Sequence, residues 1–196
     1  TMEDNGDWSV KIDANVVGSV GKGNTFGVPF RVTGTSVKTT ATWLKHDVPY
    51  RLESIVNVAD ESVPVLTLTP GTELRFSMGG GLRMGVTWGG ALIAENILFT
   101  SSAPTPAPGD WEKIWFSDKA AASTLSGCTI EYAGSDQGIY PGVLAVDDLV
   151  VAKVKVTGTT FRHNMGEVNI QTFGGDCTQY TNASPPNTFD LATNCE

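Results

Sequence analysis

Apolar and polar residues alternate over short stretches of this chain, and a glycine or proline interrupts the pattern every few residues. Near the start, Trp8, Val10 and Ile12 occupy alternate positions with polar residues between them. A period of two indicates β-strands, because successive side chains of a strand point to opposite faces. The interruptions leave no apolar stripe of helical period longer than about 10 residues, so the pattern predicts an all-β protein with little helix.

The clearest run of such stretches lies in residues 63–100. Each stretch is about four residues long, against about 5–6 for a typical strand. The stretches are 65–68, 73–76, 81–84, 91–94 and 97–99. The Gly79-Gly80 and Gly89-Gly90 joints could close antiparallel hairpins, but strands so short and so often turned favour the bent rungs of a solenoid. A degenerate repeat of residues 32–35 at 156–159 also supports stacked units.

Two of these stretches, LTLTPGT at 66–72 and GALIAENILFTS at 90–101, resemble a group of secreted bacterial repeat proteins. Those proteins adopt right-handed parallel β-helices of the pectate-lyase-like superfamily. The similarity covers about residues 43–165. It implies a short right-handed parallel β-helix in one domain, with rungs in 43–165, an N-terminal cap and first strands in 1–42, and a C-terminal cap or tail in 166–196. The matched residues are structural, so the resemblance implies an architecture and no activity.

In such a coil the inward side chains of successive turns stack into ladders. The alternation and the resemblance together predict which side chains face inward. They are Leu66, Leu68, Leu74, Phe76, Leu82, Met84, Leu92, Leu98, Phe99, Ile114, Phe116, Leu125, Cys128, Ile130, Leu144, Val146, Val154, Val156 and Phe161.

The formal net charge of −8 and the pI near 4.7 limit the expected partners. Such a charge repels a phosphate backbone and no stretch clusters Lys or Arg, so nucleic acid is not an expected partner. No apolar run approaches the about 20 residues that span a bilayer, and the polar start, 1–7, has no signal-peptide pattern. We expect a mature ectodomain whose targeting segment has been removed, located outside the cell or at its surface.

Three cysteines are too few for a disulfide scaffold. Cys177 and Cys195 lie in a polar tail with few apolar anchors, whereas Cys128 alternates with Ile130 and Tyr132. We therefore predict a Cys177–Cys195 disulfide that holds the tail, and a free, buried thiol at Cys128.

The candidate catalytic residues are Asp136, Asp147 and Asp148. If the coil gathers them on one side, they could bind Ca²⁺ or act as an acid/base pair, because both roles need carboxylates within a few ångströms of one another. The alternative is that Asp147 and Asp148 form a turn, in which Asp side chains bond their own backbone. Beyond this calcium hypothesis the sequence predicts no cofactor and no metal site, and the two histidines, His46 and His163, are expected at the surface.

Trp111, Trp115 and Tyr140 are the candidate ligand-binding residues, because flat aromatic rings stack on sugar rings when they are exposed together. The two tryptophans flank the Pro-rich excursion 103–109, whose extended geometry follows from the fixed φ of proline. That edge is the expected place for a glycan-binding groove. The alternative is that the aromatic rings cover corners of the coil as packing.

Three functions remain open on these grounds. The first is a non-catalytic extracellular β-helix module that binds a glycan or a surface protein. The second is a carbohydrate-active enzyme of the same fold, a polysaccharide lyase or hydrolase that uses the three aspartates. The third is a structural spacer or adhesin segment. An exposed pair of carboxylates with an Arg or Lys in a groove would favour the enzyme, and exposed aromatic rings without such a pair would favour binding.

Overall fold

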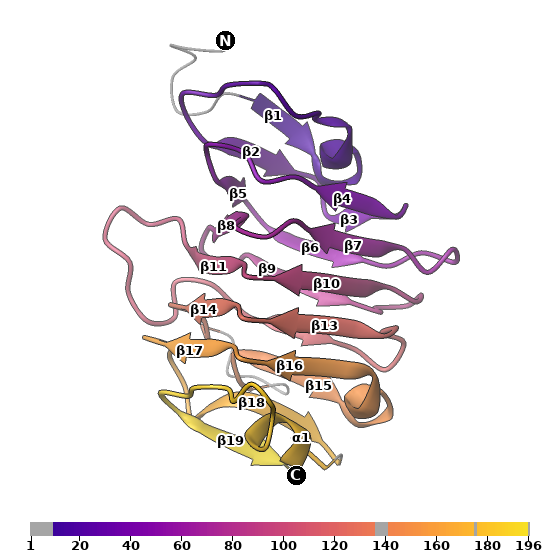
Figure 1. Ribbon diagram of the computed structural model, residues 1–196, viewed down its shortest axis with the longest axis vertical. Coiled ribbons are helices and arrows are strands. Elements are labelled where there is room, and N and C mark those ends of the chain that lie inside the picture. The colour runs from indigo at the N-terminus through magenta and orange to yellow at the C-terminus, as the bar shows by residue number, and fades with distance from the viewer. Residues whose placement is uncertain (1–9, 136–140, 175, 196) are drawn as a thin grey trace.

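The computed structural model describes residues 10–135, 141–174 and 176–195, and it shows an elongated coil with strands stacked along its long axis (Figure 1). The described strands fall into three sheets, and every pairing between them is parallel. Between Phe30 and Phe173, the chain visits the sheets in a repeating order, which we call I, II and III. The predicted parallel β-helix is therefore confirmed.

The sheets differ in length, and they extend beyond residues 43–165 at both ends. Sheet I comprises β1 (Val10–Asp13), β2 (Phe30–Thr33), β5 (Tyr50–Leu52), β8 (Glu73–Phe76), β11 (Leu98–Ser101), β14 (Thr129–Glu131) and β17 (Thr160–Arg162). Sheet II comprises β3 (Ser36–Val37), β6 (Ile55–Val58), β9 (Gly81–Met84), β12 (Ile114–Phe116), β15 (Leu144–Asp147), β18 (Val168–Phe173) and β19 (Ala192–Cys195). Sheet III comprises β4 (Ala41–Trp43), β7 (Val65–Leu68), β10 (Ala91–Glu95), β13 (Ser123–Ser126) and β16 (Val154–Thr157).

The described helices are short and lie at the ends and corners of the coil. They are the 3-10 helices η1 (Ala14–Ser19) and η2 (Asp148–Lys153) and the α-helix α1 (Thr178–Thr181). None of the helices in the described ranges is long and apolar enough to cross a membrane.

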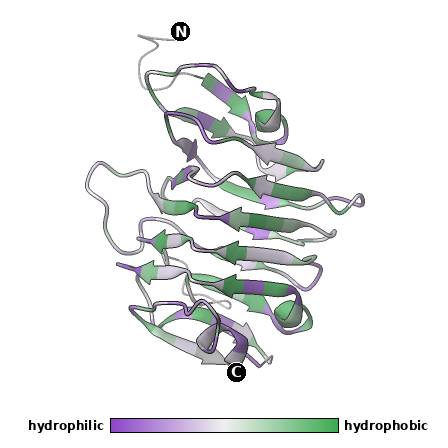
Figure 2. Ribbon diagram, in the orientation of Figure 1, coloured by the Kyte–Doolittle hydropathy of each residue, from purple (hydrophilic) through white to green (hydrophobic). Residues whose placement is uncertain are grey.

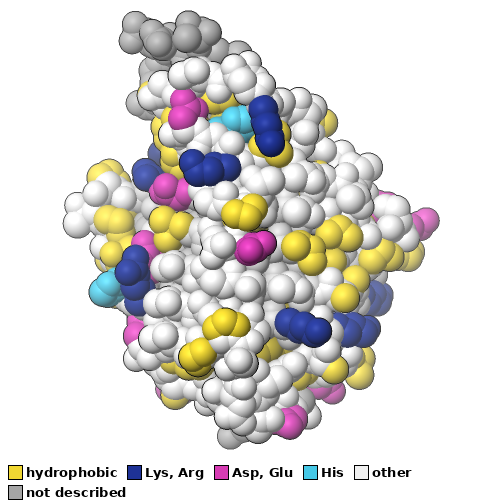
Figure 3. All heavy atoms as spheres, in the orientation of Figure 1, with side chains coloured by type: hydrophobic (Ala, Val, Ile, Leu, Met, Phe, Trp, Pro, Cys, Tyr) yellow, Lys and Arg dark blue, Asp and Glu magenta, His cyan; other side chains and the backbone are white. Residues whose placement is uncertain are grey.

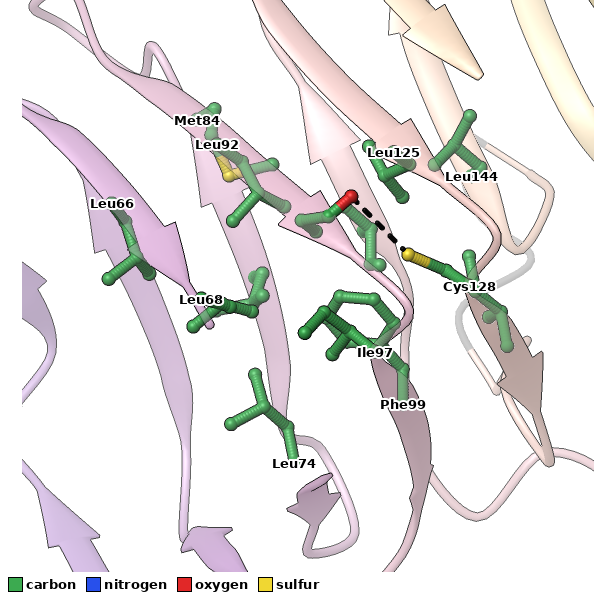
Figure 4. Close-up of a cluster of buried hydrophobic side chains, with 14 of the residues drawn as sticks. Leu66, Leu68, Leu74, Met84, Leu92, Ile97, Phe99, Leu125, Cys128 and Leu144 are labelled. Carbon is green, nitrogen blue, oxygen red and sulfur yellow. Dashed lines mark hydrogen bonds between the residues drawn. The ribbon is translucent and has the colours of Figure 1, made fainter. Parts of the chain in front are cut away.

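The core consists of apolar ladders that run along the coil axis. One ladder in sheet I joins the buried residues Phe30, Tyr50, Leu74, Phe99, Ile130 and Phe161 through the registered pairings of successive strands. Figure 4 shows side chains from all three sheets meeting in the middle of the coil, with Cys128 among them. Many outward positions are polar, so single strands carry both green and purple stretches in Figure 2.

Leu98 is the exception among the predicted inward residues. It pairs with Glu73 and Thr129 on the outer side of sheet I and is half-buried. Ile97 and Phe99 are the buried neighbours instead. Because side chains alternate along a strand, Leu98 and Phe99 cannot both face inward. The other predicted inward residues are all buried.

The N-terminal end of the coil is closed by η1 and by an aromatic cluster. The His46 ring packs against Phe26, Phe30 and Tyr50, with ring centroids 5.3, 5.1 and 5.9 Å away. Its Nε2 is buried, and no hydrogen bond within the described residues reaches it. His46 is therefore half-buried rather than a surface residue. Burial lowers its pKa below 6.5, while the nearby Asp47 carboxylate opposes that shift.

We expect the fold to lose stability as the pH falls from about 7.5 to about 5.5, because of His46. A histidine whose pKa is lowered by folding binds fewer protons in the folded chain than in the unfolded chain. The contribution of His46 to the stability of the fold is complete above the pKa that this residue has in the unfolded chain. That contribution declines as the pH falls through that value. Urea denaturation at both pH values measures the change. His46→Phe should flatten the pH dependence, and an unchanged slope in that variant would contradict the role assigned to His46.

The two cysteine side chains that the structure describes, Cys128 and Cys177, are both buried. Cys128 is free and buried, and its Sγ lies 3.6 Å from the Ala94 carbonyl oxygen, the dashed line in Figure 4. Burial raises the pKa of this thiol to about 11, so it stays protonated and unreactive at neutral pH. Cys177 is buried next to α1, where the Tyr180 hydroxyl donates to the Val151 carbonyl at 3.2 Å. The pairing of Cys177 with Cys195 stays a prediction, because the Cys195 side chain is outside what the structure describes.

We expect alkylation of the native protein to leave Cys128 unmodified until denaturant is added. Non-reducing peptide mapping should then show a linked Cys177–Cys195 peptide. Such a bridge would stabilise the fold by about 3 kcal/mol through loop closure. Cys128 linked to either tail cysteine, or three cysteines that alkylate freely in the native protein, would refute this pairing.

Candidate functional site

A groove of about 600 Å³ lies beside the Pro-rich segment that projects from the coil after β11 in Figure 1. Its walls come from three successive turns of the coil. The lining residues are Arg51, Glu53, Phe76, Ser77, Met78, Ser101, Ser102, Ala103, Pro104 and Asp110. We call this site the loop groove. Its volume is within the range of about 300–1,000 Å³ that is typical of small-ligand sites.

Strand stacking aligns one polar wall of the loop groove. The Ser77 amide donates to the Leu52 carbonyl and the Ser102 amide to the Phe76 carbonyl, both at 2.9 Å, which continues the sheet beyond the strand ends. The two serine hydroxyls consequently lie side by side, 3.3 Å apart. They form a short row of hydroxyl groups across two turns.

Asp110 fixes the base of the projecting loop. Its Oδ2 accepts hydrogen bonds from the Ser101 hydroxyl at 2.5 Å and from the Ala107 amide at 2.9 Å. The Gly109 amide adds a bond to the Ala133 carbonyl of the next turn, at 3.2 Å. The loop is therefore held at its foot while residues 104–108 are exposed.

Arg51 and Glu53 form the charged edge of the loop groove. Arg51 Nε lies 3.1 Å from Glu53 Oε1 and 3.4 Å from the Ser77 hydroxyl, and Arg31 approaches Glu53 Oε2 at 3.4 Å. The Arg51 side chain is 39% exposed, and no hydrogen bond within the described part of the chain uses its two terminal nitrogens. Arg51 therefore offers open donors at the rim.

Arg51 belongs to an outward column of cations on sheet I. The register aligns Lys11, Arg31, Arg51 and Arg75 on successive strands. Glu73 pairs with Arg75 at 2.6 Å, and Glu53 pairs with both other arginines. Figure 3 shows the two signs of charge close together along the left edge, over sheet I. Two carboxylates therefore pair with the three arginines and offset part of the positive charge of the column.

Trp111 is not part of the groove surface, which corrects its prediction as a ligand-binding residue. It is 0% exposed, its ring stacks on Phe76 at 4.2 Å, and its Nε1 donates to the Glu131 carbonyl at 2.8 Å. A ring covered in this way has no free face for a sugar. Trp111 is the packing residue that the alternative interpretation described.

Trp115 lies on the outer face of sheet II, away from the loop groove. Its Nε1 donates to Asp147 Oδ1 at 3.1 Å, and the Arg83 guanidinium lies 5.5 Å from its ring centroid. Arg83 in turn pairs with Glu112 at 3.1 Å. Burial raises the pKa of Asp147, and the neighbouring carboxylates of two further aspartates add to the rise, while the hydrogen bond from Trp115 lowers it.

Of the three candidate aspartates, the structure describes two. Asp148 is exposed at the start of η2, where its Oδ1 accepts the Leu149 amide at 2.7 Å, as the turn alternative expects. Asp136, like Tyr140, lies outside the described residues. Within the described ranges, no group of three or more His, Cys, Asp or Glu side chains could hold a metal ion. The calcium hypothesis therefore stays a prediction.

The residues that build the loop groove were missed by the sequence analysis, although it pointed to the right edge of the coil. One signal was present. Arg31, Arg51 and Arg75 recur at intervals close to the length of one turn, so a coil of that length places them in one column. Met78 carried no signal, because a methionine that precedes three glycines suggests only a corner.

No family model, curated protein or solved structure matches this chain. The resemblance to the pectate-lyase-like superfamily stays an expectation. Function has to be argued from the site itself.

Proposed function

We propose that this protein is a non-catalytic extracellular module that binds a glycan in the loop groove. The observation that carries the proposal is the make-up of the groove. The lining combines open donors on Arg51 and the hydroxyls of Ser77 and Ser102 with apolar atoms of Met78 and Pro104. A sugar likewise has both polar and apolar surfaces, with hydroxyl groups around its rim and C–H groups on its faces.

The carboxylates of the loop groove support binding rather than turnover. Glu53 pairs with two arginines, and Asp110 accepts hydrogen bonds from the Ser101 hydroxyl and the Ala107 amide. Both groups are suited to holding the groove in shape.

An enzyme remains the second candidate because of Asp147. Its raised pKa is the property that a general acid needs, and it lies beside the half-buried ring of Trp115. A hydrolase or lyase at sheet II would need a second carboxylate or a base nearby. Release of reducing ends from polysaccharides, abolished by Asp147→Asn, would favour this candidate over the first.

We expect Arg51→Ala to weaken glycan binding by about tenfold, because a donor at the rim of the groove is lost. A glycan array identifies the ligand, and titration calorimetry measures the affinity. Arg162→Ala is the matched control, since Arg162 is also an outward, ion-paired arginine of sheet I but lies outside the groove lining. Equal affinity of the Arg51 variant and the wild-type protein, or no binding to any glycan, would refute the proposal.

A further inference from the structure

The loop groove holds one cationic and two carboxylate side chains, Arg51, Glu53 and Asp110. The lining therefore has no excess positive charge, within a protein of net charge −8. Anionic sugars would meet repulsion there, since like charges disfavour each other at short range. The charge balance disfavours an anionic ligand.

Part of the groove lining is apolar. Met78 is 89% exposed, and it lines the groove together with Ala103, Pro104 and the fully buried Phe76. Methionine is flexible and polarisable, so it adapts to small apolar groups of different shape. A methyl group placed here would remove apolar surface of both partners from water.

The groove lining also offers both kinds of hydrogen-bonding group. The terminal nitrogens of Arg51 are donors that no hydrogen bond of the described residues uses. Asp110 Oδ1 adds an acceptor to the groove lining, because both hydrogen bonds to this carboxylate within the described residues go to Oδ2. A ligand group with one acceptor, one N–H donor and one methyl would match all three features.

The acetamido group has this composition. We propose that the loop groove recognises the acetamido group of N-acetylated amino sugars, with the methyl against Met78 and Pro104, the carbonyl accepting from Arg51 and the amide N–H directed to a carboxylate or hydroxyl oxygen of the groove. This inference rests on the proposed function, which assigns a glycan to the same groove. It adds the sugar class.

Two oligosaccharides of the same linkage test the inference. Chitotetraose and cellotetraose are both β-1,4-linked and differ at carbon 2, which carries an acetamido group in the first and a hydroxyl in the second. By titration calorimetry, we expect chitotetraose to bind at least about tenfold more tightly, from one buried methyl and one added hydrogen bond. Met78→Ser should reduce this preference by about threefold, because it removes the apolar contact.

Leu149→Ser serves as the control for Met78→Ser, since Leu149 is also an exposed apolar residue, 69% exposed, and lies on η2 outside the groove lining. It should leave the preference unchanged. The deacetylated tetramer of glucosamine is the third ligand. Tighter binding of this cationic sugar than of chitotetraose would show that charge and not the acetamido group is recognised, and would overturn the inference.

The remaining outcomes separate the inference from the proposed function. Equal affinity for chitotetraose and cellotetraose overturns the inference and leaves glycan binding in place. The glycan array could instead show binding of another class of sugar, weakened by Arg51→Ala, while neither tetramer binds. That result also overturns the inference and leaves glycan binding in place. Binding of no glycan at all overturns both.

Discussion

Gly90→Ala should destabilise the protein by at least about 3 kcal/mol, which is at the upper end of what overpacking a core costs. A Cβ at this position would lie 1.8 Å from the Val58 carbonyl oxygen and 2.6 Å from its carbon. Those are backbone atoms of the preceding turn. The same carbonyl accepts the Gly85 amide at 3.2 Å, so relieving the clash would break a bond between turns.

Urea denaturation followed by circular dichroism measures this loss. Gly21→Ala is the matched control, because nothing lies within 4 Å of an added Cβ at position 21 and no positive φ is required there. Gly21→Ala should change the free energy of unfolding by less than about 1 kcal/mol in either direction. If Gly90→Ala unfolded at the same urea concentration as Gly21→Ala, the close approach of the two turns would be wrong.

Trp111→Ala should cost about 3–5 kcal/mol, the range for deleting a large buried aromatic side chain. The variant loses the stacking on Phe76 and leaves a cavity beneath the loop groove, and the Glu131 carbonyl loses its indole donor. Denaturation measured as above checks the value. Trp88→Ala is the control, since Trp88 is 49% exposed and should cost less than about 1 kcal/mol.

A Trp111→Ala variant with wild-type stability but weaker glycan binding would contradict the burial of this ring. It would restore Trp111 as a ligand-binding residue. Trp111→Phe separates the two contributions further, because it keeps a ring against Phe76 and removes only the hydrogen bond to the Glu131 carbonyl.

The inward ladders were predictable because strand alternation is local and needs no knowledge of the third dimension. The error at Leu98 came from the two-residue corner between β10 and β11. There the alternation pauses at Asn96 and resumes with Ile97 facing inward. A sequence alone does not show where a corner ends. It also does not show whether the first side chain after the corner faces inward or outward.

The loop groove could be placed only roughly from the sequence. The proline run identifies a projecting loop, but the direction of each flanking side chain depends on the strand that receives it. Trp111 forms a bridge with Ala133 and packs inside the coil, whereas Trp115, four residues later, lies in β12 of sheet II and faces outward. The two tryptophans therefore never share a surface. The remaining groove residues are about one turn apart in sequence, and only the coil brings them together.

The corner between sheets I and II varies in length while the strands on both sides keep their register. It spans residues 77–80 in one turn and residues 102–113 in the next, yet β9 and β12 pair without an offset. Insertions at this corner extend outward and leave the inner ladders unchanged. Evolution can consequently exchange this loop on an unaltered coil, as antibodies exchange loops on a constant framework.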